Sequence, residues 1–251
     1  MSEANKDVQI AVTICTYNEK ENIRTLIPAI RAVLPKADIL VVDDNSPDGT
    51  AAEVEQIQKS DPRVHLLLRQ QKAGLGAATL AGFQWVIERD FDYLINMDAD
   101  WSHPPAVLPQ LVALMADADV AIASRYITGG GVQNWGPHRY FMSWGVNVYS
   151  RLLLGIKARD CSGAYRCYRV SKLREIDFTR FRSRGYAFQE EILYRCRRVG
   201  SRFRETPFVF ADRVAGQSKI NMKEVACALR DIAFLGWDRL RGIPVARDTT
   251  P

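Results

Sequence analysis

The sequence has few cysteines and histidines, no low-complexity tract and no long hydrophobic run. Its five cysteines form no CxxC pair and have no histidine partner at zinc-binding spacing, which argues against a zinc site and favours reduced thiols. The longest wholly apolar runs, such as residues 39–42 and 152–154, are far too short to span a bilayer, so we expect no transmembrane helix. The N-terminal sequence MSEANKDVQ is polar and acidic, which argues against a signal peptide. We therefore expect a cytoplasmic protein.

The composition of the 251 residues is that of a globular protein, with 47% hydrophobic and 25% charged residues. A chain of this length is expected to form a single domain, residues 1–251. The charge is segregated, because residues 1–120 contain 10 Lys and Arg against 18 Asp and Glu, whereas residues 121–251 contain 24 against 11. An acidic half suits cation binding, and a basic half suits a phosphate-bearing partner or an anionic membrane surface. Solvated helix faces explain any single arginine equally well.

Short β-branched runs alternate with longer helical patterns through the first half of the chain. This alternation predicts an α/β fold with a mostly parallel sheet and helices on both faces. The predicted strands there are 8–14, 39–43, 64–68, 93–97 and 120–123, and the predicted helices are 19–34, 50–59, 77–89 and 104–115. The less regular second half has predicted helices at 139–156, 189–198 and 222–240, strands at 164–170 and 203–209, and loops at 128–137 and 211–219.

The most informative stretch is YLINMDADWSHPP, where an apolar run ends in two aspartates, Asp98 and Asp100. With 18 aspartates in the chain, about one D-x-D pair is expected by chance. The chain has three such pairs, and only this one directly follows an apolar run; the others are Asp90/Asp92 and Asp117/Asp119. If the run is a buried strand, it places both carboxylates at the sheet edge where α/β proteins bind ligands. Paired carboxylates at such an edge can hold a divalent cation against a diphosphate.

Two further strand ends carry polar residues. The motif TYNE places Tyr17 and Glu19 after the first predicted strand, and VVDDNSPDGT places Asp43 and Asp44 at the end of the second. Tyr17 can stack on a base, and the acids can accept hydrogen bonds from a base or a ribose. Helix capping is the alternative for Glu19, and turn chemistry is the alternative after the second strand, although it explains two adjacent acids poorly. Because parallel strands share one carboxyl edge, we expect these acids to converge with Asp98.

Other residues near these motifs give weaker signals. The glycine loop KAGLG at residues 72–76 precedes a predicted helix, but it lacks the spacing of a P-loop and of GxGxxG. Trp101 and His103 are expected to be packing or turn residues rather than ligands.

Taken together, the segments TYNE, VVDDNSPDGT, KAGLGAA, MDADWSHPP, SRY–ITGG and D–CSGAYR–Y resemble the inverting family 2 glycosyltransferases. The segments GYAFQEEIL and R–VAG–QSK narrow the resemblance to the dolichol-phosphate mannose synthases, also called polyprenol monophosphomannose synthases. The matching motifs cover residues 8–225 in order. The resemblance implies a nucleotide-sugar-binding, GT-A-like α/β fold. It also implies transfer of mannose from GDP-mannose to a polyprenyl (dolichyl-type) phosphate at the cytoplasmic face of a membrane, with no nucleic-acid partner.

The resemblance also implies residue roles. Residues 1–120 would bind nucleotide and metal, and residues 121–251 would bind the acceptor. Asp98, Asp100 and Arg125 would be the catalytic residues, with Mg²⁺ or Mn²⁺ on the two aspartates. The nucleotide sugar would be contacted by these three and by Tyr17, Glu19, Val42, Asp44, Ala99, Arg213 and Lys219.

Three departures from the family pattern stand out. Cys15 stands where the family usually has proline, which alters the pocket wall. Ser102 stands where some members have a glutamine metal ligand, so the third protein ligand stays open. Many members carry C-terminal transmembrane helices, and none is expected here.

The chemistry of such a transfer fits these residue types. A cation bridging the nucleoside diphosphate stabilises the charge that develops on the leaving group. The acceptor phosphate is already an anionic nucleophile, so no general base is required. Arginine and lysine are needed to hold two mutually repelling phosphates near one anomeric carbon. A single displacement would invert that carbon.

The enzyme must also reach its lipid acceptor, which lies in a membrane. Residues 139–156 and 222–240 have apolar residues at helical spacing, so each helix can rest in a membrane interface, or alternatively face the core. We favour at least one of them touching lipid or a small membrane subunit.

Other functions stay open at this point. The nearest alternative is the same transfer from UDP-glucose or another nucleotide sugar, and the alternative of another class is a non-catalytic nucleotide-binding subunit. A nucleotidyltransferase is disfavoured because the first predicted strand is not followed by a Gly-rich loop containing Lys or Arg.

Overall fold

The structure is a computed structural model that describes residues 8–72, 74–183, 185, 187–211 and 222–246. Within these residues, seven strands form one sheet in the order β3-β2-β1-β4-β7-β5-β8, and two short strands, β6 and β9, pair separately. The strands are β1 (Ile10–Thr16), β2 (Asp38–Asp43), β3 (Val64–Leu68), β4 (Tyr93–Asp98), β5 (Val120–Ser124), β6 (Gly131–Val132), β7 (Arg166–Arg169), β8 (Phe203–Pro207) and β9 (Val209–Phe210).

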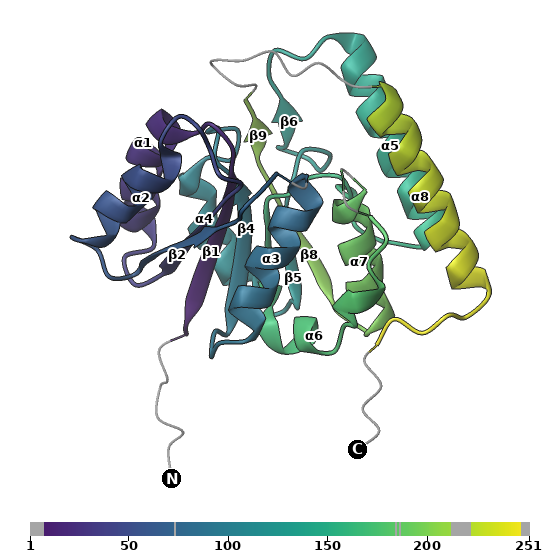
Figure 1. The fold of residues 1–251 in the computed structure, drawn as a ribbon. Helices are drawn as coiled ribbons and strands as arrows, with labels where there is room; N and C mark the ends of the chain where they lie inside the picture. The colour runs from purple at the N-terminus through teal and green to yellow at the C-terminus, as the bar shows by residue number, and fades with distance from the viewer. Residues whose placement is uncertain (1–7, 73, 184, 186, 212–221, 247–251) are drawn as a thin grey trace, which may run out of the picture.

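Helices pack on both faces of the main sheet (Figure 1). One face is covered by α1, α2 and α4, the other by α3, α6 and α7, and α5 and α8 lie side by side next to α7. The helices are α1 (Lys20–Val33), α2 (Thr50–Gln58), α3 (Leu75–Ile87), α4 (Leu108–Leu114), α5 (Pro137–Leu154), α6 (Val170–Arg174), α7 (Phe188–Arg198) and α8 (Met222–Leu240), with short 3₁₀ turns η1 (Pro105–Val107) and η2 (Phe178–Arg180).

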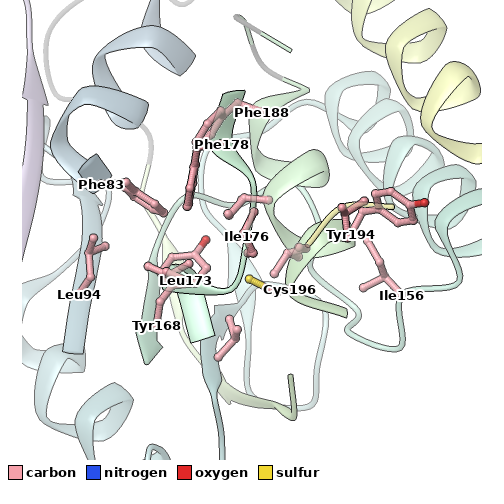
Figure 2. Close-up of a cluster of buried hydrophobic side chains, with 14 of the residues drawn as sticks. Phe83, Leu94, Ile156, Tyr168, Leu173, Ile176, Phe178, Phe188, Tyr194 and Cys196 are labelled. Carbon is pink, nitrogen blue, oxygen red and sulfur yellow. The ribbon is translucent and has the colours of Figure 1, made fainter. Parts of the chain in front are cut away.

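The core forms two layers because strand side chains alternate between the two faces of the sheet. In β4, Leu94 packs into the layer under α3 and α7, whereas its neighbour Ile95 packs into the layer under α1 and α4. Figure 2 shows part of the first layer. There the Phe83 ring lies 5.2 Å from that of Tyr168 and 6.0 Å from that of Phe188, centroid to centroid, in edge-on contacts. Burial on both faces explains why the central strands are nearly continuous apolar runs.

The predicted α/β fold with a mostly parallel sheet is confirmed. The pairs β1–β2, β1–β4, β2–β3 and β5–β8 are parallel, and only β7 runs antiparallel to both of its neighbours. In β7, Arg166 is opposite Asn96 of β4 and Ile122 of β5. The chain that precedes Arg166 therefore approaches from the carboxyl ends of β4 and β5. This one reversed strand brings a segment of the second half of the chain to the edge predicted to bind ligands.

The second half departs most from the predicted elements. The predicted loop 128–137 contains β6, which pairs with β9, and the predicted strand 203–209 divides into β8 and β9. Pro207, which has no N–H to donate, ends β8. The five-residue helix α6 was not predicted, because it is too short to show helical periodicity. In the part of the chain that is described, no helix is both long and apolar enough to cross a membrane.

Candidate functional site

The carboxyl ends of β1, β2 and β4 meet at one edge of the sheet. Cys15 of β1 is in register with Val42 of β2 on one side and with Asp98 of β4 on the other. The loop after each of these strands holds one non-glycine residue at positive φ: Asn18 at 62°, Asn45 at 56° and Trp101 at 64°. Backbone of this kind is costly for side-chain-bearing residues and gathers at functional sites. The strained loops therefore mark the same edge as the acidic residues.

The two aspartates of the D-x-D motif occupy different local settings. Asp98 is the last residue of β4 and its side chain is 35% exposed. The Asp100 carboxylate closes a tight turn, because its Oδ1 accepts from the Ser102 N–H at 3.1 Å and from the Ser102 hydroxyl at 2.5 Å. Ser102 thus orients Asp100. Both carboxylates lie at the strand edge, as expected from the sequence.

His103 holds the backbone of Asp98 through a hydrogen bond. Its Nδ1 accepts a hydrogen bond from the Asp98 N–H at 2.9 Å, so the ring proton is on Nε2, which faces Asp98 Oδ2 at 3.7 Å. The ring is buried and stacks on Tyr165, with centroids 4.7 Å apart. Burial lowers the pKa of His103, although the nearby aspartates oppose that shift. The sequence predicted only packing or a turn here, and the neutral imidazole also fixes the end of β4.

The adjacent acids Asp43 and Asp44 have distinct partners. Asp43 is fully buried and accepts from the Thr16 hydroxyl at 2.8 Å and from the Ser46 hydroxyl at 2.6 Å, which ties the ends of β1 and β2 together. Asp44 forms an ion pair with Arg69, with 2.6 Å between Oδ1 and the guanidinium. Asp43 is therefore a structural residue, and Asp44 is a carboxylate held in place by a neighbouring loop.

The other residues predicted to contact a nucleotide differ in exposure. Tyr17 is 40% exposed and its ring lies 3.6 Å from the Lys72 ammonium. Glu19 accepts from the Asn22 amide at 2.6 Å. Val42 and Ala99 are buried, and the Val42 side chain packs in the core between β2 and α3. Their roles toward a nucleoside stay predictions.

Arg125, which follows β5, is buried and tightly bound to Asp160. Its Nε donates to Asp160 Oδ2 at 2.8 Å and its Nη2 donates to Oδ1 at 2.7 Å, and Nη2 also reaches the Ser162 hydroxyl at 2.9 Å. Burial alone would favour the neutral forms, but the pairing keeps the pKa of Asp160 low and that of Arg125 high. A bidentate pair of this geometry fixes the guanidinium plane. Sequence reasoning selected Arg125 and missed Asp160, although the D–CSGAYR–Y segment contains it.

One pocket connects the two parts of the site. It has a volume of about 110 Å³, and its lining includes Asp98, His103, Arg125, Ser162, Gln189 and Phe210. A carboxylate at the end of β4 and an arginine after β5 therefore share one cavity, together with residues from the loop before β7 and from α7. Arg213 and Lys219 lie outside the described residues.

The chemistry of the donor set bears on a divalent cation. Among the residues that the structure describes, no group of three or more His, Cys, Asp or Glu side chains could hold a metal ion. Two carboxylates are nevertheless compatible with Mg²⁺ or Mn²⁺, because such ions at phosphate sites take one or two carboxylates and complete their shell with substrate oxygens and water. Asp98 and Asp100 fit that role, with the rest of the shell left to substrate.

Comparison with known proteins identifies the family of this chain. Residues 11–177 match the model of the family described as glycosyl transferase family 2. The chain is 40% identical over 238 residues to an undecaprenyl-phosphate mannosyltransferase of Micrococcus luteus, covering 93% of this chain and 98% of that protein. It is 43% identical over 238 residues to a polyprenol monophosphomannose synthase of Mycolicibacterium smegmatis, covering 92% of this chain and 90% of that protein.

Solved structures show the same fold. The glucosyl-3-phosphoglycerate synthase of Mycobacterium tuberculosis, solved with Mn²⁺, UDP and glucosyl-3-phosphoglycerate, superposes with a TM-score of 0.66. It is 17% identical, and the match covers 95% of this chain and 81% of that one. Because the family model spans more than half of the chain and the relatives align over nearly all of it, this protein belongs to glycosyl transferase family 2, a family of enzymes.

Proposed function

We propose that this enzyme transfers mannose from GDP-mannose to a polyprenyl phosphate of the dolichyl type, with inversion and with Mg²⁺ or Mn²⁺. The observation that carries the proposal is the pocket in which Asp98 and Arg125 face one cavity. A carboxylate suits the cation of a nucleoside diphosphate, and an arginine suits a phosphate acceptor. The names of the two relatives support mannose and a polyprenyl phosphate as the substrates.

The described side chains suit a single displacement. Asp98 and Asp100 would hold the cation, which would supply stabilisation of the charge on the departing diphosphate. Arg125 presents a guanidinium whose plane is fixed by Asp160, so an acceptor phosphate is positioned without reorganisation of the arginine. The acceptor is an anion that needs no deprotonation, and the neutral His103 serves position rather than proton transfer.

The nucleoside would lie against the loops after β1 and β2. Tyr17 offers an exposed ring, and Asp44 offers a carboxylate oriented by Arg69. Glu19, Val42 and Ala99 lie in the same region of the edge, and Arg213 and Lys219 are proposed phosphate contacts from sequence alone. Residues 1–120 would thus hold nucleotide and metal, and residues 121–251 the acceptor.

We place α5 and α8 at a membrane surface. Among the described residues, thirteen large hydrophobic side chains are exposed, and seven of them belong to these two helices: Tyr140, Phe141, Trp144, Leu152, Phe234, Trp237 and Leu240. The helices lie together along one side of the molecule (Figure 1), and Arg239 of α8 fastens them by donating to the Leu153 carbonyl at 2.9 Å. Such a pair suits peripheral association with a membrane from the cytoplasmic side or contact with a small membrane subunit.

A donor panel tests the transfer. Purified enzyme is given a short-chain polyprenyl phosphate with GDP-mannose, UDP-glucose or other nucleotide sugars, each with Mg²⁺ or Mn²⁺. We expect acceptor-dependent GDP release and a β-linked lipid product with GDP-mannose. Turnover of a UDP-sugar with none of GDP-mannose would overturn the donor assignment. Nucleotide binding without transfer to any lipid acceptor would instead favour a non-catalytic subunit.

A further inference from the structure

A second cavity lies along α5, next to the candidate active site. It is a groove of about 230 Å³ lined by Tyr126, Tyr140, Trp144, Asn147, Arg151 and Arg159, among others. Four of these residues come from α5 at spacings of three or four, so they form one face of the helix. None of its lining residues also lines the pocket that holds Asp98 and Arg125. The two cavities adjoin, because Asn147 of the groove donates to the Ser162 hydroxyl of that pocket at 3.1 Å, but they have different linings.

The groove lining carries two positive charges, and the acidic residue Glu205 contacts it, since its Oε2 accepts from the Arg159 backbone N–H at 2.9 Å. Arg151 and Arg159 are both exposed, and neither guanidinium has an ion pair or hydrogen bond to another side chain or carbonyl in the described structure. The groove lining contains no acidic residue. By contrast, Arg230 of α8 pairs with Asp231 at 3.0 Å, and Arg239 caps the end of α5. Two unpaired guanidiniums on one groove are suited to an anion with several acceptor oxygens.

The aromatic residues of the groove lining indicate the source of that anion. Tyr140 and Trp144 belong both to the groove lining and to the exposed apolar side chains of α5. The groove thus opens on the surface proposed above to face a membrane. Phospholipids present anionic phosphates at such a surface beside apolar chains, and aromatic side chains favour that depth.

We propose that this groove binds the phosphate headgroup of an anionic phospholipid, with Arg151 and Arg159 as its ligands, and so fixes the orientation of α5 at the membrane. The inference rests on the proposed membrane contact of α5. It does not depend on mannosyl transfer, because headgroup binding is measured without substrates.

The direct test uses a lipid in free solution. A short-chain phosphatidylglycerol is titrated below its critical micelle concentration, with the matching phosphatidylcholine in parallel, and binding is followed by calorimetry. No charged surface is present under these conditions, so nonspecific attraction to a membrane is absent. We expect saturable binding of phosphatidylglycerol alone, weakened about tenfold or more in Arg151→Gln/Arg159→Gln. The control, Arg230→Gln/Arg241→Gln, removes the same charge from α8 and from the turn that follows it, and should bind as the unchanged protein does.

The outcomes separate the alternatives. Absence of saturable binding, or equal weakening in the two double variants, would overturn the headgroup site. The acceptor's own phosphate is the other source of the same chemistry, and turnover of a water-soluble short-chain polyprenyl phosphate distinguishes it. We expect the groove variant to keep KM for that acceptor within about twofold. A tenfold rise in that KM would assign the groove to the acceptor and overturn the proposal. Unfolding curves of both variants confirm that the exposed substitutions leave the fold intact.

Discussion

The N–H of Asp98 donates to Nδ1 of His103 across a distance of 2.9 Å, within the turn that carries the D-x-D motif. This bond fixes both the tautomer of a buried imidazole and the backbone from which the Asp98 carboxylate projects. The ring is in turn held by its stack on Tyr165. The position of a predicted metal ligand therefore depends on a residue that is not itself a predicted ligand.

Substitution of His103 tests this positioning role. His103→Leu leaves the Asp98 N–H without its acceptor, so we expect the free energy of unfolding to fall by about 1–3 kcal/mol. We also expect a higher Mn²⁺ concentration for half-maximal turnover. His103→Asn places an amide oxygen near the position of Nδ1 and should restore much of the metal response. Equal metal responses in the two variants would contradict the role.

Asp100 is predicted to be required for metal-dependent turnover. Asp100→Ala should abolish that turnover with little change in unfolding, because the carboxylate is only partly buried and its hydrogen bonds to Ser102 are local ones within the turn. Asp117→Ala, at an exposed aspartate of another D-x-D pair, is the matched control and should retain full activity. Near-normal activity of Asp100→Ala would mean that the wrong acids were chosen.

The buried pair of Arg125 and Asp160 should matter for stability as well as for turnover. Asp160→Asn leaves a buried guanidinium without its counter-charge, and such losses cost about 3–5 kcal/mol. Glu175→Gln breaks the surface pair with Lys172 and should cost less than about 1 kcal/mol. Urea unfolding measures the free energy of unfolding of the two variants. A similar decrease in both would show that the buried pair stabilises the fold no more than the surface pair does.

Glu190 gives a pH-dependent prediction. Burial raises its pKa from 4.5 to about 7, although Arg166 opposes the shift, so the folded state binds the proton more tightly than the unfolded state does. Stability should therefore be full below about pH 4.5 and decline as the pH rises toward 7. Glu190→Gln lacks this titration. Its free energy of unfolding, relative to that of the unchanged protein, should therefore rise from pH 5 to pH 8 by on the order of 3 kcal/mol.

The neighbouring residue provides the control for that prediction. Glu191 accepts hydrogen bonds from Arg195 at 2.7 Å and from the Ser183 N–H at 2.8 Å. Glu191→Gln should therefore destabilise the fold across the same pH range. A stability difference for Glu190→Gln that does not change with pH would contradict the raised pKa.

Membrane contact by α5 and α8 is testable with vesicles. Phe141→Ala and Trp237→Ala each remove a large exposed apolar side chain, so we expect each to weaken sedimentation with lipid vesicles several-fold. Leu68→Ala removes a side chain of similar exposure from β3 and should leave vesicle binding unchanged. Equal effects at all three positions would place the contact elsewhere.

Much of the fold follows from local patterns. The alternation of strands and helices was predictable because apolar periodicity depends on near neighbours, and β3 begins and ends as predicted. The D-x-D motif was placed at a strand end for the same reason. The short elements of the second half were not, because α6 and β6 carry too few residues for a period to show.

Within the site, the sequence by itself determined which residue types gather after the strands, since parallel strands share one carboxyl edge. It did not separate Asp43 from Asp44, because the two are adjacent and only their partners differ: Thr16 and Ser46 for one, Arg69 for the other. The tertiary structure also decided that β7 runs antiparallel, which brings Asp160 to Arg125 across 35 residues of sequence. Such pairings arise from long-range packing, where distance along the chain carries no signal. For that reason the chain's motifs predicted the family, and only the folded protein assigned the partners that hold its charges in place.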